Sequence, residues 1–138
     1  MMHRRRVFSA IGAVLLLAGL VWQQTPERRV ERYVAAHQEA LQADVDAFFR
    51  GEPLRYDGDL ETANHWPGEH PMVEYLVPSL LPGCHGFYYS PDDVPLAFQN
   101  TAVPLEETAD GWAWRAEGGS RGFTRRLAPG WYYFEAYF

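Results

Sequence analysis

The segment Trp131-Tyr132-Tyr133-Phe134-Glu135-Ala136-Tyr137-Phe138 decides the fold. Successive side chains of an extended strand point to opposite faces. One face of this strand therefore carries Trp131, Tyr133 and Tyr137, and the other carries Tyr132, Phe134, Ala136 and Phe138. Because both faces are large and apolar, we expect this strand to lie at the centre of a sheet or to be covered by a helix.

Turn signals join this strand to the ones before it. Phe123–Leu127 leads into 131–138 through Pro129-Gly130, and Val103–Glu106 can pair with Trp112–Ala116 across Asp110-Gly111. Such spacing predicts an antiparallel meander. Upstream runs of β-forming residues predict three more strands, at Leu54–Tyr56 before Asp57-Gly58, at Met72–Val77 and at Gly86–Ser90.

A helix that can cover the sheet lies nearer the N-terminus. Thr25-Pro26 is typical of a helix start, and Gly51 fits the position just past a helix end. Between them, apolar residues recur at spacings of three and four and predict one buried stripe: Val30, Tyr33, Val34, His37, Leu41, Val45, Phe48 and Phe49. The expected fold class is α+β, with one amphipathic helix packed on an antiparallel β-sheet that has a C-terminal meander.

The chain begins with a basic head followed by an apolar run. Arg4, Arg5 and Arg6 resist translocation, while Val7–Trp22 partitions into a bilayer. The run is about 24 Å long at about 1.5 Å per residue, somewhat short of a ~30 Å hydrocarbon core. It predicts a transmembrane helix with a cytoplasmic N-terminus.

The residues after Ala18-Gly19 favour a retained anchor over a cleaved signal peptide. A signal-peptidase site needs small residues at alternate positions, and Leu20-Val21-Trp22 does not provide them. Leu20 also occupies the position where a lipoprotein needs a cysteine. We expect residues 1–24 to form a cytoplasmic stub and a single-pass signal anchor in the cell membrane, and 25–138 to form one extracytoplasmic domain.

Composition restricts the partners of that domain. It contains nine arginines and all eighteen acidic residues of the chain, which give it a formal charge of −9. Such a surface repels nucleic acid and anionic lipid headgroups, which argues against both as partners of the domain. Cys84 is the only cysteine, so the domain cannot form an internal disulfide.

Two segments resemble a group of short bacterial single-pass membrane proteins. They are Gly86-Phe87-Tyr88-Tyr89-Ser90-Pro91-Asp92-Asp93, continued to Gln99, and the aromatic strand 131–138. Members of the group have a basic N-terminus, one span, a polar helix and an aromatic C-terminal strand. The resemblance implies an architecture and no activity.

Two groups of residues have side chains that suit a zinc site or a thiol nucleophile, but their sequence context disfavours both. His65, Glu69 and His70 are residue types that bind zinc, but Pro67-Gly68 breaks any helix that would gather them, and we interpret them as polar loop residues. Cys84-His85 could be a thiol beside its base, but adjacent side chains of an extended segment point apart. We expect no metal and no cofactor.

Acidic and aromatic residues supply the remaining candidates. Ser90-Pro91-Asp92-Asp93 is typical of a short helix start that Pro95 would limit to about one turn. The aromatic residues Trp112, Trp114, Trp131, Tyr132, Tyr133 and Tyr137 are expected to be core, although three of them exposed together would form a binding platform. Glu135 among them would have a raised pKa if it were buried.

The leading hypothesis is a non-enzymatic binding or interaction module of the envelope, with a protein or glycan partner. Its candidate binding residues are Tyr88, Asp92, Asp93, Trp112, Trp114 and Glu135. One alternative is an envelope enzyme, either a hydrolase that uses Asp92, Asp93 or Glu135 or a thiol enzyme that uses Cys84 and His85. Another is an immunity-type protein that neutralises a toxin at the membrane.

Overall fold

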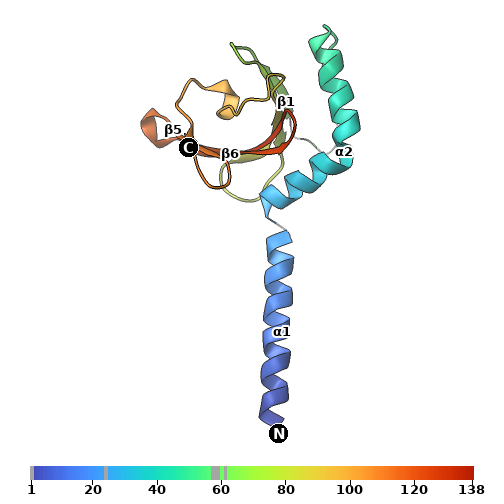
Figure 1. Cartoon of the computed structure of the whole chain (residues 1–138), viewed down its shortest axis with the longest axis vertical. Helices are drawn as coiled ribbons and strands as arrows, with labels where there is room; N and C mark the ends of the chain where they lie inside the picture. Colours follow the sequence, from blue (N-terminus) through green and yellow to red (C-terminus); the bar gives the residue numbers. More distant parts are fainter. Residues whose placement is uncertain (1, 24, 57–59, 61) are drawn as a thin grey trace.

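The computed structural model describes residues 2–23, 25–56, 60 and 62–138, so the turn predicted at Asp57-Gly58 lies outside the described residues. Helices α1 (Met2–Gln23) and α2 (Pro26–Phe49) precede an antiparallel sheet (Figure 1). Its strands are β1 (Thr62–Trp66), β2 (Met72–Val77), β3 (Cys84–Tyr89), β4 (Glu106–Glu107), β5 (Trp112–Arg115), β6 (Arg121–Ala128) and β7 (Trp131–Tyr137). Their order in the sheet is β1-β2-β3-β7-β6-β5-β4. The α+β class and the antiparallel sheet are confirmed.

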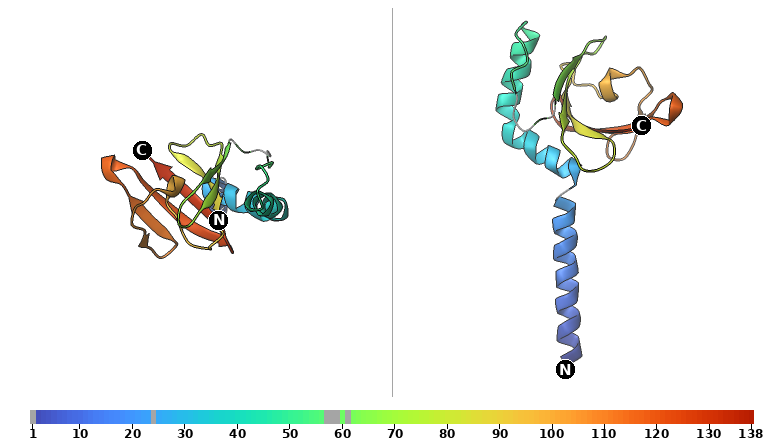
Figure 2. Two further views of the ribbon diagram at one scale, coloured as in Figure 1. Left: turned by 90° about the horizontal axis from the view of Figure 1, so that it is seen from above. Right: turned by 180° about the vertical axis from the view of Figure 1, so that it is seen from behind.

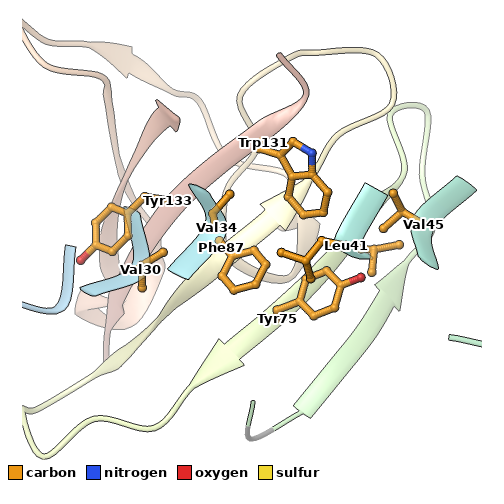
Figure 3. Close-up of a cluster of buried hydrophobic side chains, with 9 residues drawn as sticks. Val30, Val34, Leu41, Val45, Tyr75, Phe87, Trp131 and Tyr133 are labelled. Carbon is orange, nitrogen blue, oxygen red and sulfur yellow. The ribbon is translucent and has the colours of Figure 1, made fainter. Parts of the chain in front are cut away.

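Strand β7 is central, as its two apolar faces predict. It pairs with β3 on one side and with β6 on the other. Trp131 and Tyr133 pack against α2 in a core that also contains Val30, Val34, Leu41, Val45, Val73, Tyr75 and Phe87 (Figure 3). Gly86 of β3 permits this close pairing, because a Cβ there would lie 2.0 Å from the Tyr75 carbonyl oxygen. The helix-covered face is thus filled with aromatic and branched side chains.

The opposite face of the sheet is covered by the chain between β3 and β4, residues 90–105, which we call the connector. The connector contains the 3-10 helix η1 (Phe98–Asn100) and contributes Ala97 and Phe98 to a second core, which we call the connector-side core. Its partners on the sheet are Met72, Tyr88, Trp114, Tyr132, Phe134 and Ala136. Most of the aromatic residues considered for a binding platform are therefore buried, and only Trp112 and Tyr137 of the six are half-exposed.

Helix α2 begins and ends where the sequence indicates. Gly51 follows its last turn at φ +102°, a conformation that favours glycine. Val30, Val34, Leu41 and Val45 are buried, but His37 and Phe49 are exposed, so their assignment to the buried stripe was wrong. Residues 35–40 all face solvent because α2 bends along its length, as Figure 1 shows. His37 instead stacks on Tyr33, with 4.3 Å between the ring centroids.

Three strand predictions need correction. Residues 54–56 form no strand, and β1 occupies 62–66, where the sequence suggested a loop. Strand β3 begins at Cys84 rather than Gly86. In place of a strand at Val103–Glu106, the two-residue strand β4 lies at Glu106–Glu107 and pairs with β5 as expected. The β1 sequence is short and polar and does not predict a strand by itself. It becomes a strand by pairing with β2.

Helix α1 projects from the domain as a separate rod (Figures 1 and 2). Its side chains from Ile11 to Trp22 are exposed on every side, and the large apolar ones are between 51% and 71% accessible. Within the described residues, neither helix combines the length and the apolarity that a membrane span requires.

Candidate ligand cleft

A cleft of about 360 Å³ lies between the β1–β2 turn and the connector. We call it the connector cleft. Its walls include Pro67, His70, Leu96, Asn100, Val103 and Leu105. Apolar walls with a few polar groups are typical of sites that bind small molecules or short segments of a partner.

Asn100 ties the two walls of the connector cleft together. Its side-chain Nδ2 donates to the carbonyl oxygens of Pro67, at 3.2 Å, and His70, at 3.0 Å. Gln99 and Asn100 both have φ +53°, a left-handed conformation that costs free energy in residues other than glycine. Because two strained residues persist in succession, their surroundings must hold the connector in place.

Glu74 lies beneath the connector and helps to hold it in place. Its side chain is fully buried on β2, where its carboxylate accepts the indole N–H of Trp66 at 3.2 Å and the backbone N–H of Gln99 at 2.9 Å. Burial raises the pKa of Glu74 above its ordinary value, and the two hydrogen bonds partly offset this rise. In the described part of the chain, no arginine or histidine forms an ion pair with it.

Asp93 anchors the beginning of the connector to the β6–β7 turn. Its carboxylate accepts the backbone N–H of Gly130 at 2.8 Å and the hydroxyl of Tyr132 at 3.0 Å, and it forms an ion pair with Arg126. These donors, Arg126 first, lower the pKa of Asp93 to about 2. The lone pairs of Asp93 are thus largely used by the fold, which makes it a structural residue rather than a free binding group.

The short helix predicted at Ser90 is replaced by a turn. The backbone N–H of Asp93 bonds to the Ser90 carbonyl at 3.0 Å, and the Ser90 hydroxyl oxygen accepts the N–H of Val94 at 3.2 Å. Asp93 then adopts φ +52°, which a right-handed helix cannot continue through. The prediction failed because the contacts with Arg126 and Tyr132 outweigh the local helix-start pattern.

The other residues on this face border or support the connector cleft. Asp92 binds Nδ1 of His70 at 2.9 Å, so it holds one wall. Buried Tyr88 accepts the N–H of Leu96 at its hydroxyl, at 2.8 Å, and supports the other wall. Trp112 contacts Tyr132, with 6.3 Å between the ring centroids, while Trp114 is buried in the connector-side core. The tryptophans therefore belong to packing and not to an exposed platform.

Glu135 lies apart from these residues, on the helix-covered face. It accepts the hydroxyl of Tyr133 at 2.9 Å, and that hydroxyl lies 3.3 Å from Nδ1 of His85. Burial, followed by the nearby charge of Glu135, raises the pKa of Tyr133. Cys84 packs against the connector-side core, on the other side of β3 from His85. His85 is therefore not placed to act as a base for Cys84.

The residues considered for zinc are separated. His65 packs against Phe48 at 4.9 Å between ring centroids, whereas His70 belongs to the connector cleft. Among the residues that the structure describes, no three histidine, cysteine, aspartate or glutamate side chains gather as metal ligands. The titratable groups that line the connector cleft are Glu69 and His70, which form no nucleophile–base arrangement.

Sequence reasoning did not identify Glu74 and Asn100. Glu74 is the one acidic residue in the apolar run Met72–Val77, and this was the available signal. Asparagine tolerates the left-handed conformation better than most residues, but that alone does not locate a site. No family model, curated protein or solved structure matches this chain.

Proposed function

We propose that this chain is a membrane-anchored binding module of the bacterial cell envelope. Helix α1 anchors it with the N-terminus in the cytoplasm, and the α+β domain outside presents the connector cleft to a protein or glycan partner. One observation carries the anchor. Consecutive residues Val14, Leu15, Leu16 and Leu17 point in all directions around α1, and all are more than 60% exposed. A helix segment that is apolar on all sides is typically buried in a protein core or in a membrane.

The junction of the helices supports this arrangement. The guanidinium of Arg28 lies 3.9 Å from the ring centroid of Trp22, and the Thr25 hydroxyl donates to the Trp22 carbonyl at 3.0 Å. Tryptophan and arginine are residue types that favour the boundary between hydrocarbon and water. Their position at the end of the apolar run matches an interface at residues 22–28.

The geometry favours binding over an envelope enzyme. Asp93 is committed to Arg126, Gly130 and Tyr132, and Glu135 lies on the opposite face of the sheet. The acids of the alternative hydrolase therefore do not converge on one reacting atom, as acid–base catalysis requires. The connector cleft offers apolar contacts from Leu96, Val103 and Leu105 beside a few polar groups, which suits recognition.

Cysteine labelling in intact cells tests the anchor and its orientation. In a Cys84→Ser background, Glu117→Cys places an exposed thiol on the domain away from the walls of the connector cleft. A membrane-impermeant maleimide should label it before lysis, and the protein should stay in the membrane fraction after alkaline carbonate extraction. Labelling only after lysis would contradict the orientation, and release by carbonate would contradict the anchor.

Site-specific photocrosslinking tests the binding role of the connector cleft. A benzoylphenylalanine at Ala102, an exposed residue of its wall, should capture a discrete partner in cells. The matched control places the same group at Glu39, on the exposed side of α2. Identical products at both positions, or none at Ala102, would overturn the proposed site.

A further inference from the structure

We propose that the β2–β3 loop, residues 78–83, inserts into the outer surface of the same bilayer that α1 enters and forms a second membrane contact. This inference rests on the proposed function, because it uses the position of the anchor. The loop reads Pro78-Ser79-Leu80-Leu81-Pro82-Gly83 and contains no charged residue. Leu80 is 106% and Leu81 54% exposed, so the domain leaves two adjacent leucines uncovered.

Strand register places this loop at the α1 end of the domain. Cys84, the first residue after the loop, pairs with Ala136 near the end of β7. The Tyr133 side chain reaches toward this end, because its hydroxyl donates to Glu135 and lies 3.3 Å from His85 Nδ1, and it lies beside Val30 of the first turns of α2 (Figure 3). The β1–β2 turn and the β6–β7 turn lie at the other end of the sheet. Figures 1 and 2 show the β2–β3 loop on the side of the domain from which α1 projects.

The base of the loop is braced, so the leucines are held outward. His85 Nε2 bonds to the Pro82 carbonyl at 3.2 Å. Gly83 has φ +86° and lies so close to β7 that a Cβ would meet the Ala136 carbonyl oxygen at 2.5 Å. On the other flank, Val77 pairs with His85 in the sheet. Because both flanks are fixed in this way, the loop has little room to fold its leucines back onto the domain.

The backbone of the loop suits a partly dehydrated environment. Pro78 and Pro82 have no N–H to lose from water, and the N–H of Leu81 donates to the Ser79 hydroxyl at 3.1 Å. An unsatisfied backbone donor is costly in an apolar medium, and this loop presents few of them. Transfer of leucine side chains from water into an apolar medium is favourable.

A bilayer is a better occupant for this loop than another protein. Two leucines on one short loop offer far less area than a stable protein interface buries. A membrane beside α1 needs no such area, because the anchor already holds the domain at its surface and raises the effective concentration of the loop there. The geometry therefore favours lipid as the partner.

Depth-dependent quenching on the full chain in lipid nanodiscs tests the contact. Single cysteines at Leu80, Val14 and Glu69, each in the Cys84→Ser background, carry an NBD fluorophore, and lipids with a quencher on the acyl chain report proximity. We expect quenching at 80 and at 14 and none at 69. A second variant, Leu81→Asp with the label at 80, should reduce the quenching at 80 at least twofold while circular dichroism stays unchanged.

The quenching at positions 80 and 14 distinguishes the loop contact from the α1 anchor. Quenching at 14 with none at 80 would overturn the loop contact and leave the anchor intact. Quenching at 80 with none at 14 would support the loop contact and overturn the anchor. Unchanged quenching in Leu81→Asp would show that the fluorophore itself seeks the bilayer and would overturn the loop contact. A blue-shifted emission at 80 without quenching would show that the label is buried in protein and not among the acyl chains, and would overturn the loop contact as well.

Discussion

The carboxylate of Glu74 accepts the backbone N–H of Gln99 at 2.9 Å, and a buried acid on β2 thereby holds the connector against the sheet. Gln99 is in a left-handed conformation, so this hydrogen bond offsets local strain. The wall of the connector cleft consequently depends on a residue that does not line it.

Glu74→Gln should change how stability depends on pH. Burial raises the pKa of Glu74, so the folded state binds its proton more tightly than the unfolded state does. The free energy of unfolding should therefore fall as pH rises from the ordinary value of 4.5 through the raised folded value. The glutamine amide has one oxygen where the carboxylate has two, so either the Trp66 or the Gln99 N–H loses its acceptor. This should lower the free energy of unfolding by about 1–3 kcal/mol. The part of the pH dependence that comes from titration of Glu74 should disappear. Urea unfolding in detergent across this pH range measures both effects, and exposed Glu69→Gln is the control.

Asp93→Asn should destabilise the domain more than Asp92→Asn does. Asp93 binds Arg126, Gly130 and Tyr132, whereas Asp92 binds the exposed His70. Because the pKa of Asp93 is lowered to about 2, its contribution should be full above the ordinary value of 3.8 and be lost as pH falls through about 2. Thermal melts of both variants at neutral and acidic pH check this. Equal melting temperatures at neutral pH would contradict it.

Strand β7 could be predicted because its information is local. Its two apolar faces require a central position whatever surrounds them. The path of the connector could not be predicted, because contacts between residues distant in sequence determine it. Glu74 is 25 residues from Gln99, and Asp93 is 33 residues from Arg126. His37 fits the helical period yet is exposed, because a sequence pattern does not reveal that α2 bends and leaves residues 35–40 outside the core.

Gly86→Ala should destabilise the domain by about 1–3 kcal/mol or more, which is the usual cost of overpacking. The new methyl group would lie 2.0 Å from the Tyr75 carbonyl oxygen and 2.8 Å from the Phe134 ring, so β2 or β7 must shift. Urea unfolding measures the loss. Gly12→Ala is the control, because a methyl group there meets nothing within 4 Å. A Gly86 variant as stable as the parent would show that the three strands are less closely paired than described.

Cys84→Ser should leave the fold and any phenotype largely intact. Cys84 packs beside the connector-side core, and His85 is directed to the other side of β3. Removing the thiol should therefore remove a half-buried contact and no catalytic group. Circular dichroism and complementation of a deletion strain test this. Loss of the phenotype with the fold preserved would restore the thiol enzyme as the better hypothesis.

Deleting Tyr133–Phe138 should unfold the domain, whatever it binds. This removes most of the strand that joins β3 to β6, including buried Tyr133 and Phe134. Truncating one large buried aromatic residue typically costs about 3–5 kcal/mol, and a whole domain is held by only about 5–15 kcal/mol. Loss of the cooperative thermal transition, followed by near-ultraviolet circular dichroism, is the expected result.

Deleting Phe138 alone separates the loss of the strand from the loss of the chain end. Phe138 lies beyond β7 and is 77% exposed, although its ring approaches that of Phe98 at 5.6 Å. Its removal should lower the melting temperature only slightly, since little of its surface is buried. If the longer deletion still melted cooperatively near the parent temperature, β7 would be peripheral, and its aromatic side chains would become candidates for a binding surface instead of a core.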